Sequence, residues 1–175
     1  MATRRDILKF GSLAAAGSVL PGFGPAVAAL ADVPRAERPL RILILGGTGF
    51  TGPFQIAYAL ARGHRVTTFN RGLRPAIEWP GPVEQRIGDR NTGDLSALAE
   101  GEWDVCIDNP TTLPFWVRDA GQALKGRVGH YLFISTISVY ADGSAPGITE
   151  DAALAPYRGA DAMAETMDTV MADMG

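Results

Sequence analysis

The stretch that decides the fold is Arg41-Ile42-Leu43-Ile44-Leu45-Gly46-Gly47-Thr48-Gly49-Phe50-Thr51-Gly52. Its first part, together with Leu40, is a nearly unbroken apolar run, the pattern of a short strand buried on both faces. Four glycines follow within seven residues. A helical pattern then covers 53–62 and begins with Pro53, which suits a first helical turn because its missing N–H costs nothing there. The sequence therefore predicts strand, glycine turn and helix in direct succession.

The glycines are spaced as a phosphate-binding turn requires. Two registers coexist, Gly47-x-Gly49-x-x-Gly52 and Gly46-x-x-Gly49-x-x-Gly52. A pyrophosphate can rest on a helix N-terminus only where no side chain blocks its approach. We expect Gly46 or Gly47 to make the tight turn. We expect Gly49 to let backbone reach the phosphate, and Gly52 to let the helix pack against the strand. A glycine turn without a ligand is the alternative, and a Walker-type loop is excluded because no Gly-Lys-Ser/Thr follows.

The rest of the chain alternates strand and helix patterns. Strand patterns lie at 65–69, 83–88, 103–108 and 130–136, and helical patterns at about 92–99, 113–124 and 158–174. This alternation predicts an α/β fold, a doubly wound parallel sheet with helices on both faces. The apolar segment 130–136 is expected as a central strand. The methionines of the last helical segment are expected in the core, because such stripes usually pack there.

The glycine turn resembles the opening of the extended short-chain dehydrogenase/reductase family, the NAD-dependent epimerase/dehydratase enzymes, which use the second register. The segment 133–140, Phe-Ile-Ser-Thr-Ile-Ser-Val-Tyr, resembles that family's strand-five signature. The amino-acid sequences of 66–72 and 88–90 are similar to those of an atypical branch of the family, which includes the chloroplast stem-loop RNA-binding proteins. The resemblance covers Leu40 to about Tyr140, roughly the first half of the family's fold. It implies the N-terminal portion of a Rossmann-like fold and a nicotinamide dinucleotide cofactor.

The resemblance assigns cofactor contacts to the glycine turn and to positions that follow strands. These residues are Gly46, Gly47, Thr48, Gly49, Phe50, Thr51, Gly52, Asn70, Arg71, Asp89 and Ser135. Asp89 is implied to contact the adenine ring, with a turn-capping role as the alternative.

The end of the second strand pattern bears on the choice of cofactor. NAD enzymes usually place Asp or Glu here to hold the ribose 2′-hydroxyl, whereas this chain has Asn70 and Arg71. Without a carboxylate a 2′-phosphate is not repelled, and a guanidinium can bind it bidentately. Arg74 could assist. The sequence thus favours NADP, with NAD as the alternative cofactor, and a solvated turn is the alternative role for Arg71.

This sequence departs from the family's catalytic motif. The resemblance implies that Thr136 holds a substrate oxygen, but Tyr-x-x-x-Lys does not occur anywhere in the chain. Tyr157 lies near the expected tyrosine position and is the catalytic candidate, although Asp161 stands where lysine should. Either this site is degraded or the true pair lies beyond Gly175 in a longer protein. The expected reaction is hydride transfer at a hydroxyl or carbonyl carbon of a sugar-like or small substrate. A non-catalytic dinucleotide-binding module and RNA binding are the alternatives.

Residues 1–31 read as a targeting segment rather than part of the fold. Arg4 and Arg5 precede a modest apolar run, and small-residue cleavage sites extend to Ala31. The consecutive arginines resemble a twin-arginine signal, which implies the twin-arginine export machinery and a periplasmic, bacterial location. A basic amphipathic helix or an uncleaved anchor is the alternative, but the apolar run is too short for a stable membrane span. Residues 32–39 form a lead-in and 40–175 the dinucleotide-binding domain.

Composition and charge bear on which kinds of partner and metal site the protein could have. Removal of 1–31 leaves 13 basic and 18 acidic residues, a net charge of −5, and no basic run, so nucleic acid is not an expected partner. The single cysteine, Cys106, lies in an apolar strand pattern and is expected to be a small buried hydrophobe. His64 and His130 belong to no ligand cluster, so no metal site is expected.

Overall fold

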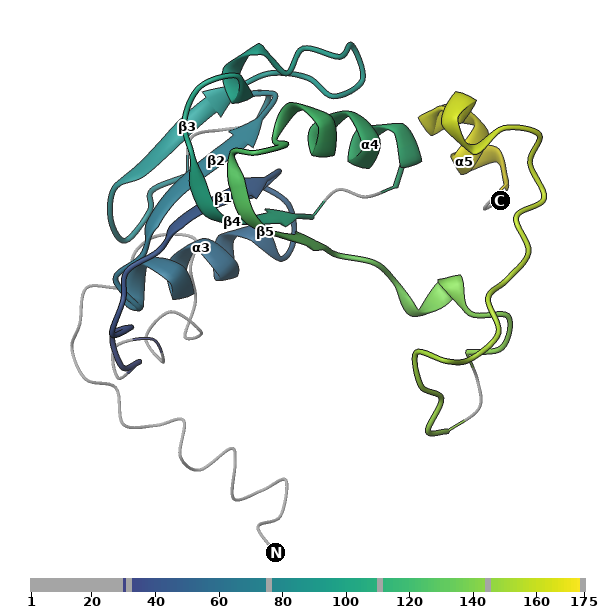
Figure 1. The fold of residues 1–175 in the computed structure, drawn as a ribbon, viewed down its shortest axis with the longest axis horizontal. Coiled ribbons are helices and arrows are strands. Elements are labelled where there is room, and N and C mark those ends of the chain that lie inside the picture. The colour runs from purple at the N-terminus through teal and green to yellow at the C-terminus, as the bar shows by residue number, and fades with distance from the viewer. Residues whose placement is uncertain (1–29, 31–32, 75–76, 110–111, 144–145, 174–175) are drawn as a thin grey trace, which may run out of the picture.

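The computed structural model describes residues 30, 33–74, 77–109, 112–143 and 146–173. Its elements follow the chain in this order (Figure 1): β1 Arg41–Leu45, α3 Gly52–Ala61, β2 Arg65–Asn70, β3 Val83–Ile87, the 3₁₀ turn η2 Ser96–Leu98, β4 Trp103–Asp108, α4 Pro114–Ala123, β5 Val128–Phe133, the 3₁₀ turns η3 Ile137–Val139 and η4 Ala162–Ala164, and α5 Met167–Asp173. The expected targeting segment lies outside the described residues, apart from Leu30.

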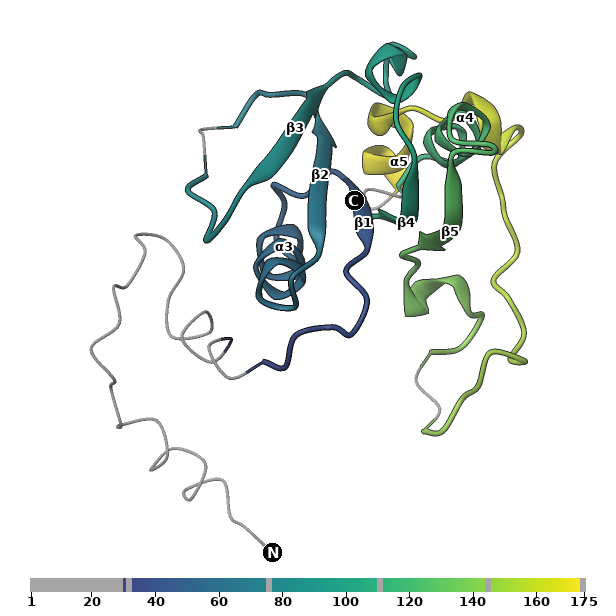
Figure 2. The same cartoon turned by 60° about the vertical axis from the view of Figure 1, so that its left-hand side comes forward.

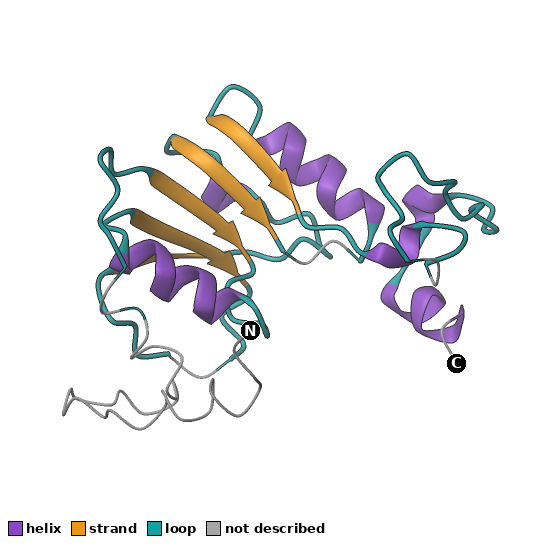
Figure 3. Ribbon diagram, turned by 90° about the horizontal axis from the view of Figure 1, so that it is seen from below, coloured by secondary structure: helices purple, strands orange, loops and turns teal. Residues whose placement is uncertain are grey.

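The five strands form one parallel sheet in the order β3-β2-β1-β4-β5. From β1 the chain first builds outward through β2 and β3, and then returns to the other side of β1 for β4 and β5. Figure 3 shows α3 on one face of the sheet and α4 on the other. The predicted doubly wound, Rossmann-like α/β fold is confirmed.

The apolar run of β1 divides its side chains between the two faces, because successive residues of a strand point to opposite sides. Ile42 and Ile44 pack with Ile56 and Ala59 of α3 in one core cluster. Leu43 and Leu45 belong to the other cluster, which includes Ala120 and Leu124 on the α4 side. Both faces of β1 are therefore buried, as its sequence predicted.

Cys106 is buried as expected from its strand pattern, and His64 is only partly buried. Cys106 is fully buried, and burial together with the nearby Asp108 carboxylate raises the pKa of its thiol to about 12. His64 accepts a hydrogen bond at Nδ1 from the backbone N–H of Leu40, 3.1 Å away. Burial and the Arg62 charge lower the pKa of this histidine.

The helix expected at 92–99 is wrong, because only the turn η2 is helical there. Asp89 and Asp94 form an antiparallel bridge that holds the chain in a tight turn. Gly93 between them has φ +74°, a left-handed conformation that no right-handed helix contains. These two features replace the first turn of the expected helix.

The last expected strand is wrong in length and in place. β5 ends at Phe133 because its partner β4 ends at Asp108, so Ser135 and Thr136 lie beyond the sheet. It is also an edge strand of the described sheet rather than a central one, and Leu132 and Phe133 are exposed.

The C-terminal part of the chain is less helical than expected. From the end of β5 the chain runs outward through 134–143 and 146–161, and it returns near α4 through η4 and α5 (Figure 2). Met163 is 45% exposed and Met167 37%, so the expected core packing of this methionine stripe is wrong for both. No helix in the described part of the chain is long and apolar enough to cross a bilayer.

Candidate functional site

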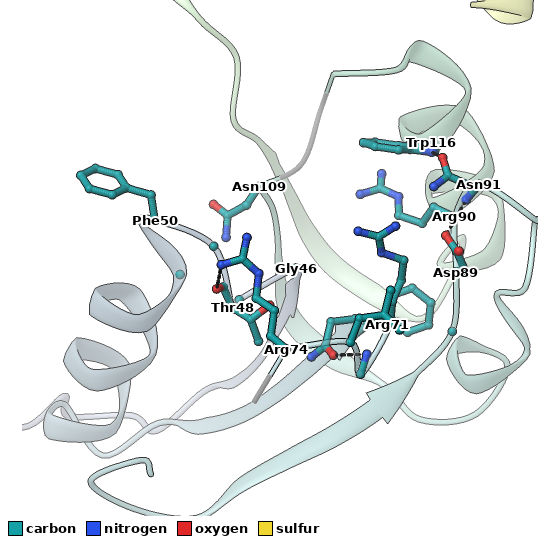
Figure 4. A pocket seen from close by; sticks show the side chains of 18 of the residues that line it. Gly46, Thr48, Phe50, Arg71, Arg74, Asp89, Arg90, Asn91, Asn109 and Trp116 are labelled. Atoms are coloured by element: carbon teal, nitrogen blue, oxygen red, sulfur yellow. Dashed lines mark hydrogen bonds between the residues drawn. The ribbon is translucent and has the colours of Figure 1, made fainter. Parts of the chain in front are cut away.

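A cavity of about 410 Å³ opens at the carboxyl ends of β1, β2, β3 and β4. Its walls are the glycine turn 46–52, the segment 69–74 after β2 and the segment 88–91 after β3, with Asn109, Trp116 and Met167 (Figure 4). The strand order reverses at β1, and doubly wound sheets bind ligands at such a switch point. The cavity therefore lies at the position where the sheet topology predicts a ligand-binding site.

The glycine turn is built by close backbone packing. Gly46 has φ 92° and Gly47 φ 77°, so both make the tight turn. A Cβ at Gly52 would come within 2.4–2.5 Å of the Gly47 backbone, so only glycine fits there. At Gly52 the start of α3 therefore packs closely on the turn that follows β1, and Ile56 and Ala59 further along the helix pack against the strand. A Cβ at Gly49 would meet nothing within 4 Å, so that backbone is open to a ligand.

The start of α3 faces this turn without a capping side chain. Thr51 is the N-cap residue, and it makes no side-chain hydrogen bond to the helix. The positive end of the helix dipole therefore carries no local compensation. Such a terminus is a ready site for an anion. Phe50, at 92% exposure, points away from the cavity (Figure 4).

The turn after β2 supplies cationic and amide groups. Asn70 Oδ1 accepts hydrogen bonds from the Gly72 N–H at 2.8 Å and from Gln85 Nε2 at 3.2 Å. Its Nδ2 is buried and makes no hydrogen bond to any residue that the structure describes. Arg74 reaches across the cavity, and its Nη1 donates to the Thr48 carbonyl oxygen at 3.2 Å. Asn70 thus stabilises the turn through its side-chain oxygen, and its Nδ2 can donate a hydrogen bond to a ligand.

Arg71 and Arg74 are both exposed and both line the cavity. Neither has a carboxylate partner among the described residues. Figure 4 shows both guanidinium groups turned toward the cavity. Their positive charge is therefore available to an anionic ligand, and a planar guanidinium can bind a phosphate with two hydrogen bonds.

Asp89 also lines the cavity, at the end of β3. Its Oδ1 accepts a hydrogen bond from the Asn91 N–H at 2.9 Å, which is the alternative, turn-capping role. A side chain at the preceding Gly88 would meet the Asp94 carbonyl oxygen at 2.5 Å and the Phe69 ring at 2.6 Å. The structure brings the Asp89 carboxylate to the cavity wall and uses one oxygen to hold the turn.

The cavity residues that the sequence did not predict as site residues include Arg90, Asn109 and Trp116. The Arg90 guanidinium makes two hydrogen bonds to Asp108, at 2.6 and 2.9 Å. Asn109 exchanges two amide hydrogen bonds with Gln55 of α3, at 3.0 and 2.7 Å. These pairs connect segments 18 and 54 residues apart, so no local pattern could reveal them.

Three predicted site residues do not line the cavity: Ser135, Thr136 and Tyr157. Thr136 is exposed, and its Oγ1 accepts the Ser138 N–H at 3.3 Å to begin η3. Tyr157 is 56% exposed, and its hydroxyl donates to Glu165 Oε1 at 2.5 Å. Hydrogen bonds from Thr169 and then Tyr157 lower the pKa of Glu165.

The carboxylate that accepts the Tyr157 hydrogen bond is therefore that of Glu165. Asp161, which was expected beside the tyrosine, instead accepts the Met163 N–H at 2.8 Å and caps η4. No cluster of three or more His, Cys, Asp or Glu side chains that could hold a metal ion occurs within the described ranges.

The solved structures that resemble this chain include three nucleotide-bound or nucleotide-sugar enzymes. The Bordetella bronchiseptica enzyme WbmG in complex with NAD matches with a TM-score of 0.58 and 21% identity, over 71% of this chain and 46% of that one. UDP-galactose 4-epimerase matches at 0.56 and 21%, over 66% and 45%. UDP-N-acetylglucosamine 4-epimerase from Bacillus cereus matches at 0.52 and 20%, over 67% and 46%. The fold is Rossmann-like.

These neighbours are enzymes of the NAD-dependent epimerase/dehydratase family, the family that the sequence resembles. At such identities the likeness establishes the fold. A curated relative, the chloroplast stem-loop binding protein of 41 kDa b from Arabidopsis thaliana, is 32% identical in an alignment of 132 residues that covers 67% of this chain and 35% of that protein. No protein-family model matches the sequence. The chain thus spans about a third of its curated relative and under half of the matching solved structures.

Proposed function

We propose that the cavity binds a nicotinamide dinucleotide, and NADP in preference to NAD. The observation that carries this proposal is the meeting of the open glycine turn with Arg71 and Arg74 in one cavity at the switch point of the sheet. The open backbone at Gly49 and the uncapped start of α3 fit a pyrophosphate. WbmG, which has the same fold, was solved in complex with NAD.

The end of β2 supports the choice of NADP. No acidic side chain stands in the segment 69–74 to hold a ribose 2′-hydroxyl or to repel a 2′-phosphate. Arg71 and Arg74 supply two guanidinium groups there. Asn70 Nδ2, buried without a partner among the described residues, supplies a further donor at the same wall. This donor set matches the ribose phosphate of NADP better than the hydroxyl of NAD.

For the whole protein, we propose oxidoreductase chemistry of the epimerase/dehydratase kind on a sugar-like or small substrate. Bound nicotinamide would supply hydride transfer at a hydroxyl or carbonyl carbon. In this chain the glycine turn and the arginines bind and orient the dinucleotide. Thr136 Oγ1 is the group proposed to hold the substrate oxygen, and Tyr157 is the candidate for proton transfer. Both are exposed and would need to approach the cavity.

A non-catalytic dinucleotide-binding module is the second candidate. It is favoured by one observation: Thr136 and Tyr157 lie outside the cavity, and Glu165 holds the Tyr157 hydroxyl. A lysine that could lower the pKa of this tyrosine does not follow it in the motif spacing. The residues proposed to hold the cofactor meet in one cavity, whereas the groups proposed for proton transfer lie outside it.

Calorimetric titration with NADPH tests the binding proposal. Saturable binding by the unmutated chain and its loss in Gly49→Val are expected, because the new side chain occupies the approach to the turn. Unchanged affinity in Gly49→Val would contradict the placement of the pyrophosphate. A carbonyl-reduction assay on the same sample separates the two candidates, because the binding module gives affinity without turnover.

We further propose export through the twin-arginine machinery to the periplasm, with 1–31 removed. The proposal rests on Arg4, Arg5 and the weakly apolar run that follows them. A folded, cofactor-loaded domain is suited to this route, because it transports proteins that have already folded.

A further inference from the structure

Arg90 differs from the other two arginines of the cavity. It is only 8% exposed, and both of its Nη atoms bond to the Asp108 carboxylate, which is fully buried. The Tyr131 hydroxyl donates to the same carboxylate at 2.5 Å. Burial and this hydrogen bond raise the pKa of Tyr131, so its hydroxyl stays a donor. The charge of Arg90 is thus compensated inside the fold, unlike the charges of Arg71 and Arg74.

The position of the Arg90 guanidinium is also fixed. Two hydrogen bonds to one carboxylate hold its plane, and its central carbon lies 5.6 Å from the ring centre of Trp116. The Trp116 indole is in turn fixed, because its Nε1 donates to Asn91 Oδ1 at 3.1 Å. In Figure 4 Trp116 lies over one side of Arg90, and the guanidinium stands in the cavity wall away from Thr48 and Phe50 of the glycine turn.

We propose that the Arg90 guanidinium, backed by Trp116, is the surface on which the adenine ring of the dinucleotide stacks. The inference rests on the proposed function. It assigns recognition of the base to Arg90, which is not among the residues proposed to bind the pyrophosphate or the 2′-phosphate. A planar guanidinium stacks on the face of an aromatic base. Because its charge is already paired with the Asp108 carboxylate, it attracts a phosphate only weakly. Because its rotamer is already fixed, stacking on it costs little side-chain entropy.

The arrangement orders the ligand along the cavity. The pyrophosphate lies at the glycine turn, the 2′-phosphate at Arg71 and the adenine at Arg90, which is the sequence in which these walls follow one another from β1 to β3. The two kinds of arginine then differ in their response to salt. The contribution of exposed Arg74 weakens as salt screens it, whereas the stacking contribution of Arg90 does not.

Two ligands separate base from phosphate: ADP, which carries both, and inorganic pyrophosphate, which lacks the base. The variant is the double substitution Arg90→Met with Asp108→Asn in the 175-residue chain. It removes the planar guanidinium, leaves no unpaired buried charge and keeps an acceptor for Tyr131. We expect its affinity for ADP to fall about tenfold, the scale of one base stack, and its affinity for pyrophosphate to change by less than about twofold.

Two further variants complete the experiment. Trp116→Leu keeps the Arg90–Asp108 pair but removes its aromatic backing, and a fall in ADP affinity with unchanged pyrophosphate affinity is expected. Arg74→Gln is the matched control, because it removes a solvated cation that reaches the glycine turn at Thr48, where the pyrophosphate is proposed to lie. It should weaken both ligands, and by more at low salt than at high salt.

The outcomes decide between base and phosphate recognition. Equal weakening of ADP and pyrophosphate in the double variant, or unchanged ADP affinity in a sample that melts cooperatively, overturns the inference. Where the double variant does not fold, Trp116→Leu decides, and ADP affinity equal to that of the unmutated chain overturns it. Binding of NADP without measurable ADP binding overturns it as well. If the unmutated chain binds neither ADP nor NADP, the proposed function itself fails.

Discussion

Gly52→Ala should damage the fold at the glycine turn, and Gly49→Ala should not. The added methyl group at residue 52 would lie 2.4 Å from the carbonyl carbon and oxygen of Gly47. Ordinary contacts are about 3.5–4 Å, so backbone must move by about 1 Å, and overpacking of this kind typically costs about 1–3 kcal/mol. At residue 49 the methyl group meets nothing within 4 Å. Alanine there leaves stability unchanged or raises it by about 0.4–1 kcal/mol, because it restricts the unfolded chain.

Thermal unfolding followed by circular dichroism measures this difference. For a domain of this size about 1 kcal/mol corresponds to about 2–4 °C in Tm. The Tm of Gly52→Ala should therefore fall by about 2–12 °C, whereas that of Gly49→Ala should stay within about 4 °C of the unmutated chain and not fall. Equal Tm values for Gly52→Ala and the unmutated chain would refute the reasoning, as would a larger loss in Gly49→Ala. Either result would mean that the turn does not pack as described.

Three further predictions concern export, the buried thiol and turnover. Replacement of Arg4 and Arg5 by lysine should retain the protein in the cytoplasm, as cell fractionation would reveal, and normal export of that variant would refute the twin-arginine assignment. The folded pKa of Cys106 is raised to about 12, above that of the unfolded thiol, so its contribution to stability is complete below about pH 9 and decreases as pH rises from there. Denaturant titrations at pH 8 and 10 should show this fall, and Cys106→Ala should lessen it, whereas an unchanged pH slope in the variant would contradict it. Tyr157→Phe should leave NADPH affinity unchanged, and both the unmutated chain and the variant should reduce carbonyl substrates only slowly. If the unmutated chain instead works at ordinary enzymatic rates and the substitution abolishes them, Tyr157 is the catalytic residue.

The fold and the cofactor wall were predictable because their signals are local. The apolar run of β1, the glycine spacing and the helical pattern of α3 are adjacent in sequence and form one unit in the structure. Asn70, Arg71 and Asp89 follow strand patterns, and parallel strands bring their carboxyl ends to the same edge. Every cofactor residue predicted from these signals, except Ser135, lines the cavity. Whether they bind the cofactor stays a prediction.

The parts that sequence reasoning missed depend on distant partners. The end of β5 is set by where β4 ends at Asp108, so the apolar pattern of 130–136 overran it. The Arg90–Asp108 pair joins the turn after β3 to the last residue of β4, although β2 and β1 separate these two strands in the sheet, and neither residue carries a local sign of its partner. The C-terminal methionines have the spacing of a buried helix face, but no described surface covers Met163 or Met167 well enough to bury it.

Comparison of NADP and NAD binding by the unmutated 175-residue chain tests the central claim most directly. A hydrogen bond to a charged group contributes about 1.5–3 kcal/mol, so calorimetry should find NADP bound about tenfold to a hundredfold more tightly than NAD. Arg71→Ala should remove most of that difference while NAD affinity stays nearly constant. Tighter binding of NAD by the unmutated chain, or no binding of either dinucleotide, would contradict the account.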